Sequence, residues 1–295
     1  MLRPRLRIPR ASRLWRPAIS SRQIHSVPHL PQFDPEEGVP GLLSPGGFDM
    51  AWIQYMHFVV EKLNVLIAGD DLEQQDPLSI VKATAREPSQ AHIFNYASMA
   101  FNNHFFFENI ARVGEDPNEP SGEDRIPVQL RQELTRQFSS VETLRREFLS
   151  TAMGMFGPGF VWLVKPVQSD QLRILPTYLA GTPFTAAHWR RQGVDMNTQG
   201  PASRDVVDGW MSRTQVGAGA NIGSRFIDPS MAAPGGTDVI PLLCLNTWEH
   251  VWLRDYGVGA GNVGGKRQFV KSWWEVIDWN KVEDRAKLGK LALKT

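Results

Sequence analysis

The C-terminal half of the chain contains a short apolar run that leads into a dense group of polar and aromatic residues. The run, residues 239–245, has the length and composition of a buried strand. It continues into residues 246–256, which read Asn-Thr-Trp-Glu-His-Val-Trp-Leu-Arg-Asp-Tyr. Asn246 and His250 are four residues apart, a spacing that aims two side chains at one point where a turn enters a helix. An acid in place of Asn246 would complete half of a metal site, but an amide is a much poorer ligand than a carboxylate.

Length and composition limit the architecture. A chain of 295 residues with 42% hydrophobic residues can bury one sizeable core or two small ones. Because Cys244 is the single cysteine, it forms no internal disulfide. It lies inside the apolar run and is expected to be a small buried side chain. No stretch of about 18 consecutive apolar residues exists, and no membrane span is expected.

Charge is distributed unevenly along the chain. Residues 1–33 contain seven arginines and no acid, which is the composition of a mitochondrial targeting sequence, with a plausible processing region at residues 20–26. A basic arm that binds RNA or a membrane is the alternative. Because the whole chain has a net charge of +1, the rest of the chain carries −6. This balance argues against a protein that coats nucleic acid.

The hydrophobic pattern changes from helical to strand-like along the chain. Helices are expected at about residues 48–67 and 91–111, and one or two more at 128–156. Strands are expected at 159–164, 172–178 and 239–245, followed by a helix at 269–291. The sequence therefore predicts an α+β fold: an N-terminal helical hairpin domain at 34–120, then a C-terminal α+β domain at 121–295 with a small antiparallel sheet. Residues 183–237 are too long for an ordinary loop and are interpreted as an insertion.

Several blocks, taken in this order, resemble the iron/manganese superoxide dismutases over about residues 39–182 and 238–285. Residues 246–256 are similar to that family's Asp-x-Trp-Glu-His motif and the Asp-Tyr that follows it. Residues 94–107 resemble its second metal-ligand helix, 156–164 its Gly-Ser-Gly-Trp-x-Trp-Leu strand, and 178–183 its Asn-x-x-Thr-Pro loop.

The resemblance also shows where the metal site has been lost. The family's His, His, Asp and His ligands fall on Ala51, Asn103, Asn246 and His250, so only His250 is kept. The residues that orient these ligands in the family fall on Tyr55, Met56 and Met99. A redox metal needs anionic and imidazole ligands, so we expect no metal, no cofactor and no catalytic residue.

Two nearby histidines offer one way to rebuild a metal site. His57 and His104 each lie one residue away from a family position. One residue on a helix turns a side chain by about 100°, so neither is expected to point into the site without a shift of register.

The resemblance implies that Glu249 and His250 form an interface. In the dismutases this pair bridges two subunits, and a charge-assisted hydrogen bond of this kind has value without metal. A solvated glutamate is the alternative. The Tyr and His that complete the family interface fall on Leu253 and Tyr55, which favours a different, complementary subunit and hence a heterodimer.

Together, a targeting sequence, a dismutase fold and a dismantled metal site resemble the non-catalytic dismutase-like proteins of the fungal mitochondrial small ribosomal subunit. This resemblance implies a structural ribosomal protein in the mitochondrial matrix. Its expected partners are small-subunit ribosomal proteins, a second dismutase-like subunit and, to a limited extent, ribosomal RNA. The insertion at 183–237 carries both arginines and aspartates and is a candidate contact segment. The alternatives are a mitochondrial superoxide dismutase with a divergent site and a mitochondrial binding protein outside the ribosome.

Overall fold

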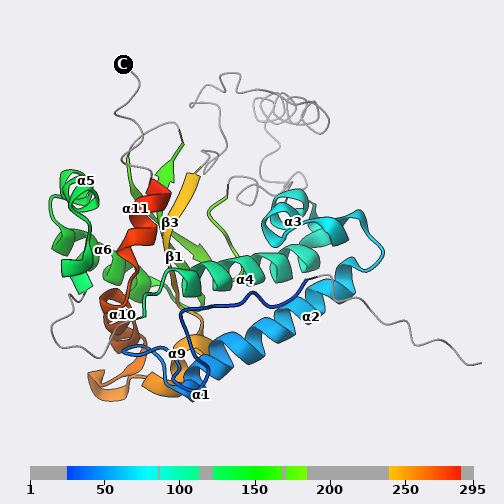
Figure 1. Cartoon of the computed structure of the whole chain (residues 1–295), viewed down its shortest axis with the longest axis horizontal. Coiled ribbons are helices and arrows are strands. Elements are labelled where there is room, and N and C mark those ends of the chain that lie inside the picture. Colours follow the sequence, from blue (N-terminus) through cyan, green and yellow to red (C-terminus); the bar gives the residue numbers. More distant parts are fainter. Residues whose placement is uncertain (1–24, 86, 113–121, 168–170, 185–238, 287–295) are drawn as a thin grey trace, which may run out of the picture.

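The computed structural model describes residues 25–85, 87–112, 122–167, 171–184 and 239–286. The first long helical rod combines α1 (Pro45–Phe48), a π-helical segment η1 (Asp49–Gln54) and α2 (Tyr55–Ile67), which appear as one continuous helix in Figure 1. The Ser44 hydroxyl caps its start by accepting a hydrogen bond from the Gly47 amide. The rod ends where Gly69 takes a positive φ of 81°. The predicted helix at 48–67 is confirmed.

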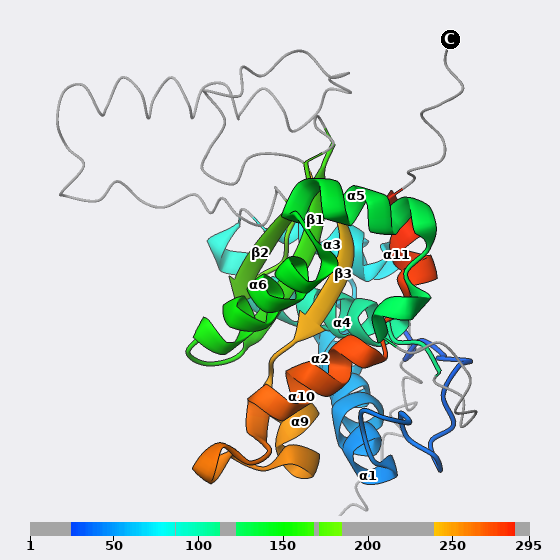
Figure 2. The same ribbon diagram turned by 90° about the vertical axis from the view of Figure 1, so that its left-hand side faces the viewer.

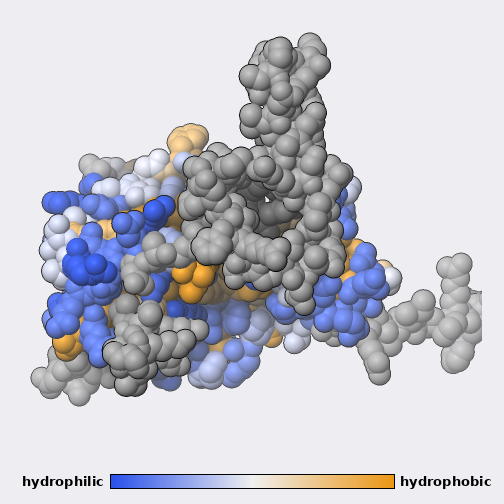
Figure 3. Space-filling view, turned by 90° about the horizontal axis from the view of Figure 1, so that it is seen from above, coloured by the Kyte–Doolittle hydropathy of each residue, from blue (hydrophilic) through white to orange (hydrophobic). Residues whose placement is uncertain are grey.

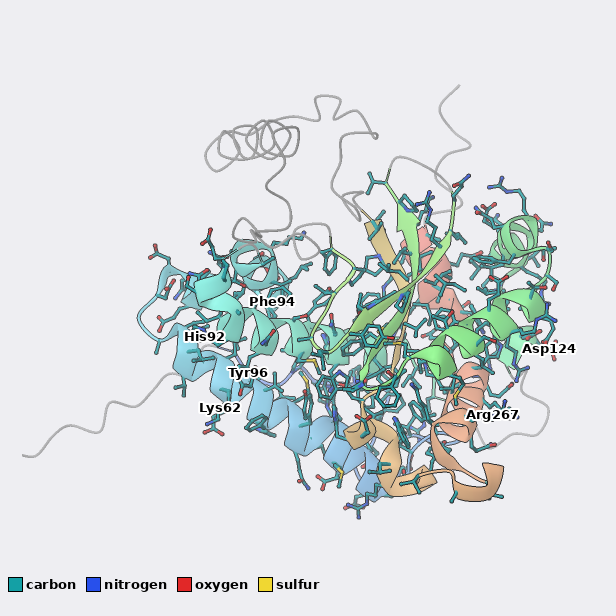
Figure 4. All side chains as sticks on the ribbon, turned by 180° about the vertical axis from the view of Figure 1, so that it is seen from behind. Lys62, His92, Phe94, Tyr96, Asp124 and Arg267 are labelled. Carbon is teal, nitrogen blue, oxygen red and sulfur yellow. The ribbon has the colours of Figure 1, made fainter. Side chains whose placement is uncertain are left out.

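A helical hairpin forms when the chain returns along this rod. It passes through η2 (Asp71–Gln74), α3 (Pro77–Thr84) and η3 (Pro88–Gln90) into the long helix α4 (Ala91–Glu108). Between the two long helices, the rings of Phe58 and Tyr96 pack edge to face at 6.1 Å, and the Lys62 ammonium lies 6.0 Å from the Phe58 ring. Figure 4 shows Lys62 and Tyr96 at this end of the hairpin, far from Asp124 and Arg267 in the other half.

Two amphipathic helices follow, α5 (Val128–Phe138) and α6 (Val141–Gly154), after the short turn η4 (Gly122–Arg125). Ser139 has a φ of 68° and breaks the predicted 128–156 segment in two. The Ser140 hydroxyl then caps α6 by accepting from the Thr143 amide. The sheet that comes next consists of β1 (Gly159–Pro166), β2 (Arg173–Tyr178) and β3 (Val239–Asn246).

The sheet is antiparallel, as the sequence predicted, and its strand order is β2-β1-β3. The central strand β1 is buried along its whole length. Helices α5 and α6 lie on one side of the sheet, and α4 lies on the other (Figure 2). Gly159 at the start of β1 allows the backbone of β2 to come close, because a Cβ there would lie 2.2 Å from the Thr177 carbonyl oxygen.

The C-terminal helices are α9 (Glu249–Tyr256), α10 (Gly265–Glu275) and α11 (Trp279–Ala286), with the turn η7 (Ala260–Asn262) before α10. The single helix predicted at 269–291 is therefore wrong, because α10 and α11 are separate; residues 287–291 lie outside the described residues. The chain breaks at residues 276–278 because its backbone bonds elsewhere: the Ala111 amide donates to the Val276 carbonyl, and the Asp278 amide donates to the Asn109 carbonyl.

One large core joins the hairpin to the sheet, and a smaller cluster fills the far end of the hairpin. The face in Figure 3 is mostly hydrophilic over the described residues, with small hydrophobic areas. Among those residues, no helix has both the length and the apolar character to cross a membrane. The domain boundaries at 120 and 121 stay a prediction, and the insertion lies outside the described residues except for its first two.

Candidate functional site

The candidate site begins where β3 ends. Asn246 is the last residue of β3 and pairs with Phe160 of β1. Its side chain is fully buried, and its Oδ1 accepts a hydrogen bond from the Trp248 amide at 2.9 Å. This Asx-type turn ends the strand and directs the chain into α9, because it satisfies a backbone donor just before the helix starts. The amide of Asn246 therefore has a local structural role.

The side-chain amide nitrogen of Asn246 reaches across to the hairpin. Its Nδ2 donates to Oδ1 of Asn103 on α4 at 3.0 Å, and Nδ2 of Asn103 donates to the Ala51 carbonyl oxygen at 3.1 Å. All three residues are buried. We call this series of hydrogen bonds, through Ala51, Asn103 and Asn246, the amide chain. It joins β3, α4 and η1, three elements that are far apart in the sequence.

Ala51 contributes to the amide chain with its backbone only. It lies within η1, and π-helical segments occur frequently at functional sites. The methyl side chain of Ala51 contains no donor atom, so this position takes part through its carbonyl oxygen. The resemblance to the dismutases predicted a former metal-ligand position at Ala51. In the structure its carbonyl oxygen accepts from Asn103, which in turn accepts from Asn246.

His250 lies four residues after Asn246, in the first turn of α9. Its ring stacks on Tyr55 of α2, with centroids 3.8 Å apart and the planes 19° from parallel. Its Nε2 is buried without a hydrogen-bond partner among the described residues. Burial lowers the pKa of His250 to about 4, so the ring is neutral at physiological pH. Burial also raises the pKa of the Tyr55 phenol, with a smaller contribution from Tyr96.

These four positions do not fit an iron or manganese ion. Both asparagine oxygens already accept hydrogen bonds, from the Trp248 amide and from Asn246 Nδ2, and Ala51 has no ligand atom. Only His250 offers a free ligand nitrogen, whereas a redox metal needs several anionic or imidazole ligands. Buried Met56 and Met99 occupy positions where polar groups would orient such ligands. Across the described residues, no three His, Cys, Asp or Glu side chains gather in a metal-binding group.

The two neighbouring histidines do not rebuild the site. His57 is exposed on α2. His104 is half-buried, with its ring centroid 5.9 Å from that of Trp52, and its pKa is lowered mainly by burial. The His57 imidazole therefore lies on a different face of its helix from Met56, and the His104 imidazole on a different face from Asn103.

The surface around α9 has an exposed apolar group, which we call the sheet-end patch. It consists of Phe156, Tyr178 and Leu179, which are 98%, 53% and 59% exposed. The indole nitrogen of Trp248 donates to the Leu179 carbonyl at 3.3 Å, so the patch adjoins the start of α9. Glu249 is exposed at this same point. Burial lowers the pKa of Lys266, and the Glu249 carboxylate partly opposes this shift.

The assignment of the four ligand positions rests on the family resemblance and stays a prediction. The sequence did not predict the stacking of Tyr55 on His250 or the hydrogen bonds of the amide chain. The matching change of two ligand positions to asparagine was the one available signal, because two amides can bond to each other.

Comparison with known proteins agrees with this fold. Residues 127–194 and 215–285 match the model of the iron/manganese superoxide dismutases, C-terminal domain. Small ribosomal subunit protein mS43 of Schizosaccharomyces pombe is 26% identical over 261 residues, which cover 88% of this chain and 84% of that protein. Small ribosomal subunit protein mS42 of the same yeast is 25% identical over 210 residues, which cover 71% of this chain and 73% of that protein. An iron superoxide dismutase of Entamoeba histolytica is 24% identical over 226 residues, which cover 77% of this chain and 81% of that protein.

The chain therefore has an α+β fold similar to that of the iron/manganese superoxide dismutases. It resembles both metalloenzymes and small ribosomal subunit proteins over most of its length.

Proposed function

We propose that this chain is a structural protein of the mitochondrial small ribosomal subunit and supports mitochondrial translation as a metal-free member of the dismutase fold. The amide chain carries the proposal, because it uses the ligand positions of an enzyme for hydrogen bonds that a metal would have to break. The similarity to two small ribosomal subunit proteins supports the ribosomal part. The acid-free, arginine-rich N-terminus supports the mitochondrial location.

Sedimentation tests this proposal. Mitochondrial lysate is separated on a sucrose gradient at moderate salt, and the chain is followed with an antibody or a C-terminal tag. We expect it to travel with the small ribosomal subunit, and to move with that peak when the subunit is dissociated from the large one. A chain that stays at the top of the gradient would favour a binding protein outside the ribosome.

The alternative is a dismutase with a divergent site. The similarity to iron superoxide dismutases favours it. The donor set disfavours it, because a single imidazole does not hold iron or manganese with useful affinity. Dismutase activity and metal content of the purified chain separate the two proposals.

We further propose that the α9 surface binds a second, non-identical dismutase-like subunit. The exposed Glu249 carboxylate at the start of α9 would accept a charge-assisted hydrogen bond from the partner, as the resemblance to the dismutase interface implies. The sheet-end patch would add apolar area to the same interface. Most of the remaining ribosomal contacts are proposed to be with proteins, because the chain after residue 33 is acidic.

Two single substitutions and a control test this interface. Glu249→Ala and Phe156→Ser are expected to reduce recovery of the partner subunit by about tenfold or more, since charged and aromatic contacts dominate such interfaces. The melting temperature should change little, because both side chains are exposed in the single chain. Glu147→Ala, at an exposed position on α6, is the matched control. Equal recovery with all three variants would place the interface elsewhere.

A further inference from the structure

The described part of the chain starts with an extended segment, residues 25–43, that we call the strap. In Figure 1 it runs as a dark blue line along the long helices α4 and α2 before the chain turns into α1. Its apolar side chains enter the main core: Leu30, Phe33, Val39, Leu42 and Leu43 are at most 8% exposed. The strap is therefore part of the folded body.

The first described residue, His25, is clamped to the hairpin. Its amide donates to Asn64 Oδ1 at 3.1 Å, and its carbonyl accepts from Asn64 Nδ2 at 2.8 Å. The ring Nδ1 lies 3.0 Å from the same Asn64 oxygen, and Nε2 lies 2.8 Å from the Gln75 carbonyl oxygen. One asparagine of α2 thus holds both the backbone and the ring of His25.

Further along the strap, aromatic packing fixes the chain. The Phe33 ring meets Phe48 edge to face at 5.8 Å, and Phe48 meets Phe107 of α4 in the same way at 5.7 Å. The Gln32 side-chain amide donates to the Phe107 carbonyl at 3.4 Å. Removing residues 25–33 would delete the clamp and expose Phe48 and its neighbours to water.

Composition and fold therefore place the start of the body at different residues. Composition extends the targeting sequence to residue 33, because the first acid is Asp34. The structure places residues 25–33 against α2 and α4, so the acid-free composition continues into a segment that the core needs. Residues 1–24 lie outside the described residues.

We propose that the targeting sequence is removed by cleavage within residues 20–25, so that the mature chain begins no later than His25 and keeps the whole strap. This inference rests on the mitochondrial location in the proposed function. In the cleavage a peptidase adds water across one peptide bond: the carbonyl carbon gains the hydroxyl, and the nitrogen gains the proton as a new α-amino group. Once the strap is docked, its buried backbone resists further trimming.

N-terminal peptide mapping of the chain from isolated mitochondria tests the cleavage. The expected first residue lies between Ser21 and His25. A chain that starts after His25, or that keeps Met1 inside mitochondria, would overturn the proposal. A chain absent from mitochondria would refute both the location and the cleavage, but would leave the role of the strap to a second experiment.

That experiment compares purified forms lacking residues 1–24 or 1–33. The shorter deletion is expected to melt at the same temperature as the full chain. The longer one should melt about 10 °C lower, because it loses buried Leu30 and Phe33. Asn64→Leu should also lower the melting temperature in the form lacking 1–24, whereas Asn95→Leu, at an exposed position on α4, should not. Equal melting of the two deletions would show that the strap is dispensable and overturn the inference.

Discussion

Replacing Asn246 with aspartate restores the acid of the dismutase motif and should destabilise this protein. Asn246 is fully buried, and its Nδ2 donates to Asn103 Oδ1. In the Asn246→Asp variant two acceptor oxygens face each other. Rotating the Asn103 amide does not solve this, because its Nδ2 would then leave the Ala51 carbonyl. The result is a buried carboxylate that keeps the Trp248 amide as a donor but, among the described residues, gains no cation to balance its charge.

The magnitude depends on pH. Above its folded-state pKa the carboxylate is charged, and the loss is expected to be about 3–5 kcal/mol of unfolding free energy. Burial raises the folded-state pKa above the unfolded value of about 3.9, so the penalty shrinks by up to about 1.4 kcal/mol per pH unit as the pH falls between these values. The protonated acid donates to Asn103 as the amide did, and the remaining loss is about 1 kcal/mol.

Urea unfolding of the variant and the unchanged protein at pH 7.5 and pH 5.0 measures this difference. Asn109→Asp is the matched control: Asn109 is equally buried and its Nδ2 also donates to an acceptor, the Phe105 carbonyl, but its Oδ1 accepts from the Arg285 guanidinium. A carboxylate there is paired with a cation, so its penalty should not grow as the pH rises. An Asn246→Asp variant as stable as the unchanged protein at pH 7.5, or one with a deficit independent of pH, would refute the reasoning.

Two further predictions concern His250 and metal. Because the pKa of His250 is lowered to about 4 in the isolated chain, its neutral form stabilises the fold above the unfolded pKa of about 6.5, and this stability is lost as the pH falls toward 4. Between pH 7 and pH 5 the loss should be about 2 kcal/mol in urea unfolding, and His250→Phe should remove this part of the pH dependence; an unchanged pH profile in that variant would contradict the assignment. A chelator, or added Mn²⁺ or Fe²⁺, should leave the melting temperature of the purified chain within about 1 °C, because a ligand that does not bind the native state does not stabilise it. A metal-dependent rise of several degrees would show that a binding site exists.

The sequence predicted those parts of the structure that depend on local pattern. The long helices and the three strands follow from hydrophobic periodicity. The assignment of Ala51, Asn103, Asn246 and His250 as former ligand positions rests on the family resemblance and stays a prediction. The amide chain did not follow, because it depends on the relative placement of η1, α4 and β3, which no local pattern specifies. Neither did the π-helical segment or the Tyr55–His250 stack.

The ends of the predicted segments failed for physical reasons. The break before α11 arises because Val276 and Asp278 bond to residues near the end of α4, and these tertiary contacts override a continuous helical pattern. The strap was hidden within a targeting composition, because only Leu30 and Phe33 among its first residues signal burial, and their anchor, Asn64, lies on a different element.

The most direct test of the central claim is the metal content of the chain recovered from purified mitochondrial small ribosomal subunits. A metal-free dismutase fold held by the amide chain predicts a chain present in about one copy per subunit, with less than about 0.1 iron or manganese ion bound to it and no dismutase activity. Iron or manganese near one ion per chain, together with dismutase activity, would contradict it.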